Sequence, residues 1–389
     1  MSDTLPMMPV SANDYTDICD TVRKICVGFP GEYWRGLDDL PAGSGYPEHF
    51  VQALGESGIM AAAVPEEFGG VGLPLTALAA ITATINESGC NSATFVAQAH
   101  MTELVSRYGN QAQKSEILPK LAANEVRLQT LAALDEGERN ETEGFALVAV
   151  QEPLGVRLTG QKSRTCFASK SDYIVVLAHR ENSSGSDLLL IEPARIKQGE
   201  MEITPYEEMN NDCSAVLAFD RLTLGKDAVI GEAGNGTKHL DDISAYRQVL
   251  DAAAAIGDGR FFSRRGVAYA NERVVFGNLI GKYQGIQFPL AKAQVEIEAA
   301  DVSMRKAAIL YDNRSDATGA ALVARHLAIE AAWAMADAAF TTFGGFAFAR
   351  EYDIERKWRD VRASRVSAVS FRTDLLRLAE TELKLPRSD

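Results

Sequence analysis

The sequence contains no long apolar run and no excess of positive charge. Its 389 residues are 46% hydrophobic and 24% charged, yet no stretch approaches the ~18 consecutive apolar residues of a membrane-spanning helix. The 39 Lys and Arg against 53 Asp and Glu leave a net charge of −14, with the two signs interspersed along the chain. This composition excludes a disordered chain, a fibre and an integral membrane protein, and it argues against a nucleic-acid partner.

Cysteine is scarce, and its spacing argues against two common uses. The five residues Cys19, Cys26, Cys90, Cys166 and Cys213 form no CxxC pair. We therefore predict neither a disulfide framework nor a zinc or other metal site, and a reducing compartment fits the free thiols. The first residues lack the basic start and apolar run of a secretory signal, so the expected location is the cytoplasm.

At roughly 150 residues per domain, the length predicts two or three domains, and the first third reads as helical. Apolar residues recur at helical spacing within 47–60, and the Ala-rich segment 75–108 has the same period. The segment 64–73 contains three glycines, which predicts a turn with positive φ or close backbone contact. Pro119 is expected to interrupt the helix that follows.

The period changes from 3.6 to 2 between about 128 and 230. Three short aliphatic runs, 173–178, 187–191 and 215–219, are bounded by Gly, Pro, Ser and Asn, as strands are. Gly155 and Gly160 flank a further expected hairpin strand. The middle of the chain is therefore predicted to be a β-domain.

Helical periodicity returns from Asp241 onward. An apolar stripe runs along 243–256, and Gly257 and Gly259 would let a neighbouring backbone approach closely. Further helices are predicted at 284–312, 318–340 and 367–383. The predicted order gives three domains, 1–125 helical, 126–236 β and 237–389 helical, with strands in the middle domain only.

Four glycine-containing segments are informative because of their order and their distances from one another along the chain. They read PEEFGGVGL at 65–73, GNQAQKSEILPKL at 109–121, NERVVFG with YQGIQ at 271–287, and FGGFAF leading to ERKWRD at 343–360. Each alone is weak, because a glycine pair is usually only a turn. Their order and spacing on a helix–strand–helix layout resemble the acyl-CoA dehydrogenase family over nearly the whole chain.

The resemblance implies an α+β multidomain fold with an N-terminal all-α domain, a middle antiparallel β-barrel-like domain and a C-terminal four-helix bundle. It also implies FAD at a subunit interface of a homodimer or homotetramer, an acyl-CoA or other acyl-thioester substrate, and an electron-transfer flavoprotein as acceptor. A heteromer stays open as the alternative assembly.

The diphosphate side of the family's FAD site is intact by this resemblance. Arg273, Phe276 and Gly277 match the segment that reaches the flavin diphosphate of a neighbouring subunit, and a guanidinium suits a phosphate. A salt bridge to an acidic neighbour is the competing structural role for Arg273. The family's cofactor-binding positions also fall on Gln284, Thr341 (in place of the usual Gln), Gly344 and Gly345.

The flavin-ring side departs from the family pattern. Leu134 and Asp135 begin the segment that matches the family's Leu-Thr-Glu-Pro motif, but the proline and the following Gly-hydroxyl-acid element are absent. Arg164, Thr165 and Cys166 stand where the family has Trp-Ile-Ser/Thr. A thiol is a weaker donor than a hydroxyl, and Arg164 would either lie over the ring or point to solvent.

Both positions of the family's catalytic glutamate hold other residues by this alignment. The commoner position falls on Ala368, and the second falls on Tyr246, followed by Arg247. Tyrosine has a pKa near 10, so holding it as a phenolate at pH 7 costs about 4 kcal/mol. Tyr246 is therefore either an unorthodox base assisted by Arg247 or a core residue; Asp242 and Glu136 are conceivable surrogates.

Three functions follow from this pattern. The first is a FAD-dependent oxidoreductase acting on an acyl-thioester with an atypical base. The second is a relative performing base-independent elimination on an acyl-CoA. The third is a non-catalytic or half-site subunit that contributes Arg273 to a partner's flavin. The sequence does not distinguish them, because function is determined by the site.

Overall fold

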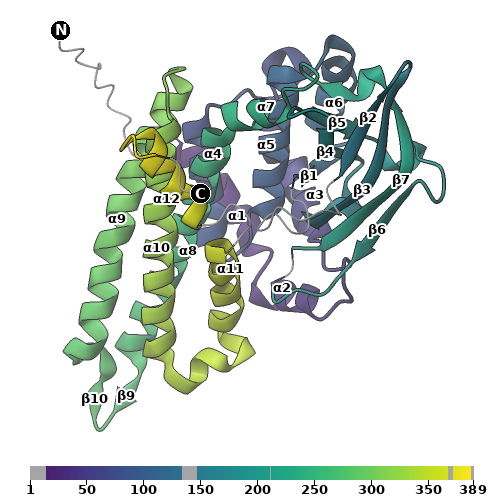
Figure 1. Ribbon diagram of the computed structural model, residues 1–389. Coiled ribbons are helices and arrows are strands. Elements are labelled where there is room, and N and C mark those ends of the chain that lie inside the picture. The colour runs from purple at the N-terminus through teal and green to yellow at the C-terminus, as the bar shows by residue number, and fades with distance from the viewer. Residues whose placement is uncertain (1–14, 134–146, 211, 367–370, 387–389) are drawn as a thin grey trace.

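The computed structural model describes residues 15–133, 147–210, 212–366 and 371–386. Helices lie at both ends of the chain and strands in the middle, with the sheet on one side of the long C-terminal helices (Figure 1). No helix in these described ranges is long and apolar enough to cross a membrane. The limits 1–125, 126–236 and 237–389 remain our proposed domain boundaries.

The N-terminal part is helical, as predicted, and the segment 75–108 contains two helices. The helices of this part are α1 (Thr16–Val27), α2 (Gly31–Asp38), α3 (Glu48–Glu56), α4 (Leu75–Glu87), α5 (Ala93–Tyr108) and α6 (Gln111–Ala122). In the glycine segment, Gly69 and Gly72 have φ of 86° and 64°, which confirms the expected turn. The expected interruption at Pro119 is wrong, because α6 continues to Ala122 with Pro119 inside it. The helical bonding also continues past this residue, where the Ala123 N–H donates to the Pro119 carbonyl at 2.9 Å.

The middle part is one twisted sheet. Its strands are β1 (Leu128–Ala132), β2 (Val148–Glu152), β3 (Gly155–Cys166), β4 (Tyr173–Arg180), β5 (Ser186–Ile191), β6 (Met201–Pro205), β7 (Ser214–Gly225) and β8 (Val229–Ile230). The order is β6-β7-β3-β2-β4-β5-β8, with β1 beside β4. The sheet is mixed rather than purely antiparallel, because β4 pairs in parallel with both β1 and β2.

The C-terminal part contains α7 (Gly236–Asp242), α8 (Ser244–Glu272), α9 (Gln284–Asp312), α10 (Thr318–Phe343), α11 (Ile354–Val366) and α12 (Phe371–Thr381). The helices predicted at 284–312 and 318–340 are confirmed as α9 and α10. The prediction at 367–383 contains α12, but α11 was not predicted as a separate helix. The stripe from Ile243 to Ile256 is buried, and Gly257 lies against Ala83 O of α4.

A short hairpin lies outside the middle sheet, so the expectation of strands there alone is wrong. It consists of β9 (Val274–Val275) and β10 (Asn278–Leu279). The two turn residues, Phe276 and Gly277, have φ of 50° and 75°. Positive φ at both central positions is the geometry of a type I′ turn, which suits the twist of a two-residue hairpin.

Candidate functional site

The residues matched to the diphosphate side gather at the end of the long helices that carries this hairpin (Figure 1). Arg273 follows the last residue of α8, and Phe276 stands at the hairpin turn. Arg273, Phe276, Phe343, Gly345 and Phe346 line an open groove of about 760 Å³. Gln284 begins α9, and Thr341 lines a neighbouring hollow of about 320 Å³ beside the same helix.

Arg273 has no acidic neighbour in this groove. Its guanidinium carbon lies 5.4 Å from the centre of the Phe346 ring, and no described carboxylate lies within 4.0 Å of it. The competing role, a salt bridge within the chain, is therefore not what the described residues show. An unpaired guanidinium on an open apolar groove is chemically suited to an anionic group brought by another molecule.

The glycine pair leaves this groove open rather than enabling close packing within the chain. A Cβ added at either Gly344 or Gly345 would meet no atom within 4 Å. The φ of Gly344 is 57°, a conformation that other residues adopt only with strain. The space beside both glycines is available to a ligand or to a second chain, while Phe276 is 96% exposed.

The residues matched to the flavin-ring side lie at the end of β3. A bulge between Lys162 and Thr165 gives Arg164 a φ of 48°, and the Arg164 guanidinium lies 3.8 Å from Glu208. Thr165 is fully buried, whereas Cys166 is partly exposed and its Sγ is 3.7 Å from Ser214 Oγ. Burial raises the pKa of Cys166 to about 12, so this position presents a thiol at neutral pH.

Tyr246 and Arg247 point to different surroundings. The Tyr246 ring is buried 5.5 Å from the Tyr311 ring, and burial raises the pKa of Tyr246 well above 10. Arg247 instead pairs with Asp251 at 2.7 Å. A buried phenol that stays protonated cannot accept a proton from a substrate, so this geometry favours the core role for Tyr246.

The other base candidates gain no support from the described residues. Asp242 lies on the surface, where its Oδ2 accepts a hydrogen bond from the Tyr108 hydroxyl at 2.8 Å. Ala368 and Glu136, like Leu134 and Asp135, lie outside the residues that the structure describes.

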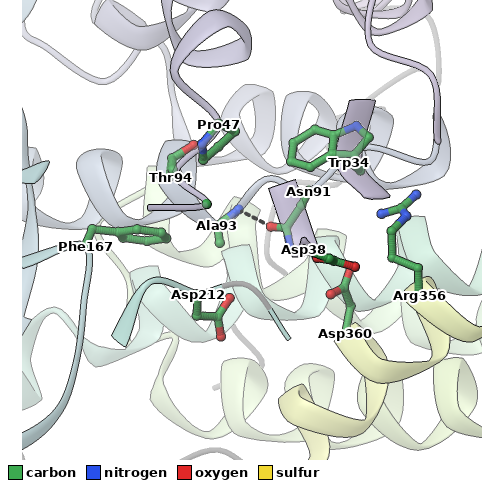
Figure 2. Close-up of a pocket in the computed structure, with 11 residues that line it drawn as sticks. Trp34, Asp38, Pro47, Asn91, Ala93, Thr94, Phe167, Asp212, Arg356 and Asp360 are labelled. Atoms are coloured by element: carbon green, nitrogen blue, oxygen red, sulfur yellow. Dashed lines mark hydrogen bonds between the residues drawn. The ribbon is translucent and has the colours of Figure 1, made fainter. Parts of the chain in front are cut away.

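Sequence reasoning missed an acidic cavity between β3 and the helices. It lies beside Phe167, the residue after Cys166, and is lined by Asp38 of α2, Asp212, Asp360 of α11 and Thr94 of α5 (Figure 2). Burial, with Asp360 and Glu208 nearby, raises the pKa of Asp212 to about 6. Asp212 is half-buried, and its position two residues before β7 was the available signal.

Two family models match the chain. Residues 13–125 match the acyl-CoA dehydrogenase N-terminal domain, and residues 245–368 match the acyl-CoA dehydrogenase C-terminal domain. The chain belongs to the acyl-CoA dehydrogenase family. The three-part acyl-CoA dehydrogenase fold implied by the sequence motifs is thereby confirmed.

Solved structures share this fold at low sequence identity. A glutaryl-coenzyme A dehydrogenase in complex with glutaryl-CoA superposes with a TM-score of 0.85 at 22% identity, covering 98% of each chain. The FAD complex of PigA gives 0.85 at 18% identity, covering 97% of this chain and 100% of that one. A chain of the ChsE4-ChsE5 complex from Mycobacterium tuberculosis gives 0.84 at 18%, covering 97% and 99%. Similarity at this level of identity establishes the acyl-CoA dehydrogenase fold, but it does not establish which reaction this chain performs.

Proposed function

We propose that this acyl-CoA dehydrogenase family member is a FAD-dependent oxidoreductase acting on an acyl-CoA or other acyl-thioester, without the family's usual glutamate base. The observation that carries the proposal is Arg273, an arginine without a described carboxylate partner on an open groove. Members of this family are typically FAD-dependent enzymes, and a relative of the same fold holds FAD. We expect an electron-transfer flavoprotein as the acceptor and the cytoplasm as the location.

The described residues fit FAD on its diphosphate side. Arg273 would bind the diphosphate, Phe276 and Gln284 would border it, and the open space beside Gly344 and Gly345 would admit the adenosine end. When bound, FAD supplies a two-electron acceptor for a substrate carbon–carbon bond. On the ring side, Thr165 and Cys166 end the strand that would support the flavin, with a neutral thiol at Cys166.

The protein's own part in the reaction is then mainly binding and orientation. Preorganised contacts supply a large share of catalysis even where no side chain moves a proton. General-base catalysis typically contributes 10²–10⁴-fold, and the protonated Tyr246 does not provide it. We therefore expect slow oxidation of ordinary saturated thioesters, and base-independent elimination stays the alternative reaction.

A second candidate function is a half-site subunit in a heteromeric enzyme. It is favoured because the groove at Arg273 is open, whereas Tyr246, at one position matched to the family's base, is buried. A relative of the same fold comes from a complex of two different proteins. In that arrangement this chain would offer Arg273 to a flavin held mainly by its partner.

The absorbance spectrum of the protein purified alone tests both candidates. The oxidised-flavin bands, with about one FAD per chain after gel filtration, are expected for the FAD enzyme. A flavin-free chain that does not take up added FAD would contradict the enzyme proposal. Recovery of flavin only on mixing with a homologous subunit would establish the half-site role instead.

A further inference from the structure

A cavity of about 190 Å³ lies between α1, α4, α8 and α9, and we call it the four-helix cavity. Its described lining residues are all different from those of the groove at Arg273. The residues of α4 that line it recur every three or four positions between Thr76 and Glu87, which is one face of a helix. A cavity of about 150 Å³ accommodates one benzene molecule, so this space suits a molecule of about eight non-hydrogen atoms.

Much of the lining consists of short or flexible apolar side chains. Ala79 and Ala83 of α4 and Met304 and Ala308 of α9 line the cavity, and each of them is buried. Alanine fills little of the space between two helices, and a methionine side chain adapts to the shape of what it contacts. This part of the cavity can therefore accept a short aliphatic chain.

The polar part of the lining contains two arginines that share one carboxylate. The guanidinium of Arg260, on α8, lies 3.3 Å from Asp301 Oδ2, and Arg305 Nε lies 2.9 Å from the same oxygen. Asp301 is only 7% exposed, and three quarters of the Arg260 side chain is also covered, since 25% of it is exposed. One positive charge thus exceeds what Asp301 neutralises, and an uncompensated charge away from water favours an anionic partner.

Arg260 also has unused hydrogen-bond donors. A guanidinium carries five N–H groups, yet Arg260 makes no hydrogen bond to any residue that the structure describes, and its one ion pair is with Asp301. The other charged groups of the lining have partners of their own: Arg23 is 2.6 Å from Asp20, and Glu87 is 4.0 Å from Arg264. The donors of Arg260 are therefore available to a ligand inside the cavity.

We propose that the four-helix cavity binds a short aliphatic monocarboxylate of about six carbons. Its carboxylate would accept hydrogen bonds from Arg260 and Arg305, since guanidinium and carboxylate groups are matched in charge and geometry. Its chain would lie against the alanines of α4 and α9. The inference is independent of the proposed function, because the cavity is separate from the groove proposed for FAD.

A charged ligand and its neutral isostere provide the test. The full-length protein as purified would be titrated with hexanoate and with hexanamide, and binding would be followed by ligand-observed NMR. The two molecules have the same shape, so the difference between them reports the contribution of the negative charge. We expect hexanoate to bind about tenfold or more tightly than hexanamide, as for a charge-assisted contact.

Variants identify the cavity as the origin of that preference. Arg260→Met keeps an unbranched apolar side chain without the charge, and it should reduce the preference for hexanoate to about twofold or less. Arg305→Met should act in the same direction, and its side chain is 42% exposed, so the change is mild for folding. Ala308→Leu fills the apolar part and should weaken both ligands by about tenfold or more. Arg221→Met on β7 is the control and should bind like the unmodified protein, because Arg221 is 72% exposed.

The outcomes separate this inference from the proposed function. Equal binding of hexanoate and hexanamide, no binding of hexanoate, or a preference that survives in both Arg260→Met and Arg305→Met would overturn the carboxylate site. Hexanoate that still binds to Ala308→Leu but is displaced by butyryl-CoA would be in the thioester site. That result would overturn this inference while supporting the proposed function.

Discussion

At the scale of single residues, flavin retention is expected to depend on Arg273. In the proposed site, Arg273→Ala would remove a charge-assisted, bidentate phosphate contact, which corresponds to about 1.5–3 kcal/mol of binding free energy. The dissociation constant for FAD, measured by fluorescence titration, should rise at least about tenfold. Arg221→Ala is the matched control, since Arg221 is 72% exposed on β7. Equal FAD affinity in the two variants would rule out the role of Arg273.

Residue identities alone predicted where the family pattern holds and where it fails, but not what the altered residues do. The sequence left the role of Tyr246 open between a catalytic base and a core residue. Only its packing against Tyr311 favours the core role. The sequence left the role of Arg273 open between a phosphate ligand and a salt bridge. Only its surroundings, where no described carboxylate lies within 4.0 Å, favour the first role. Asp212 escaped notice because its environment combines α2, α5 and α11, which are distant in sequence.

At the scale of secondary-structure elements, the close approach of α8 to α4 depends on Gly257. A Cβ there would overlap Ala83 O and lie 2.8 Å from Asn86 Cβ, so Gly257→Ala should cost about 1–3 kcal/mol of unfolding free energy. Gly285→Ala in α9 is the control, because its Cβ would meet nothing within 4 Å. Denaturant unfolding measures both, and a Gly257→Ala protein as stable as the Gly285→Ala protein would contradict this packing.

Elements with strong local patterns were predictable, whereas those fixed by distant contacts were not. The helices α9 and α10 follow from periodicity over more than 20 residues. The parallel pairing of β4 with β1 and β2 depends on how the sheet closes, which no local pattern encodes. The β9–β10 hairpin was missed because its strands have two residues each, too few to show an alternation.

At the scale of the whole molecule, exposed apolar residues on α9 support the expected homo-oligomer. Val295 and Val302 are 69% and 70% exposed and stand seven residues apart, on one face of the helix. Such surfaces commonly mark subunit contacts. The double variant Val295→Glu, Val302→Glu should lower the mass measured by light scattering from dimer or tetramer toward monomer, because buried unpaired carboxylates oppose association.

A control for charge lies outside α9. Lys197→Glu changes the net charge by the same two units, and Lys197 is a largely exposed residue near Glu200. It should leave the assembly intact. Equal masses for the unmodified protein and the double valine variant would show that this face of α9 is not the subunit contact.

The central claim is that the chain binds FAD for acyl-thioester chemistry but lacks the family's base. Anaerobic stopped-flow mixing of the flavin-loaded protein with butyryl-CoA and longer saturated thioesters, followed at the flavin absorbance, tests it most directly. The account predicts flavin reduction slower by about 10²–10⁴-fold than in a relative that has the glutamate, measured in the same way. Flavin bleaching as fast as that of the relative would contradict it, because another residue would then have to act as the base.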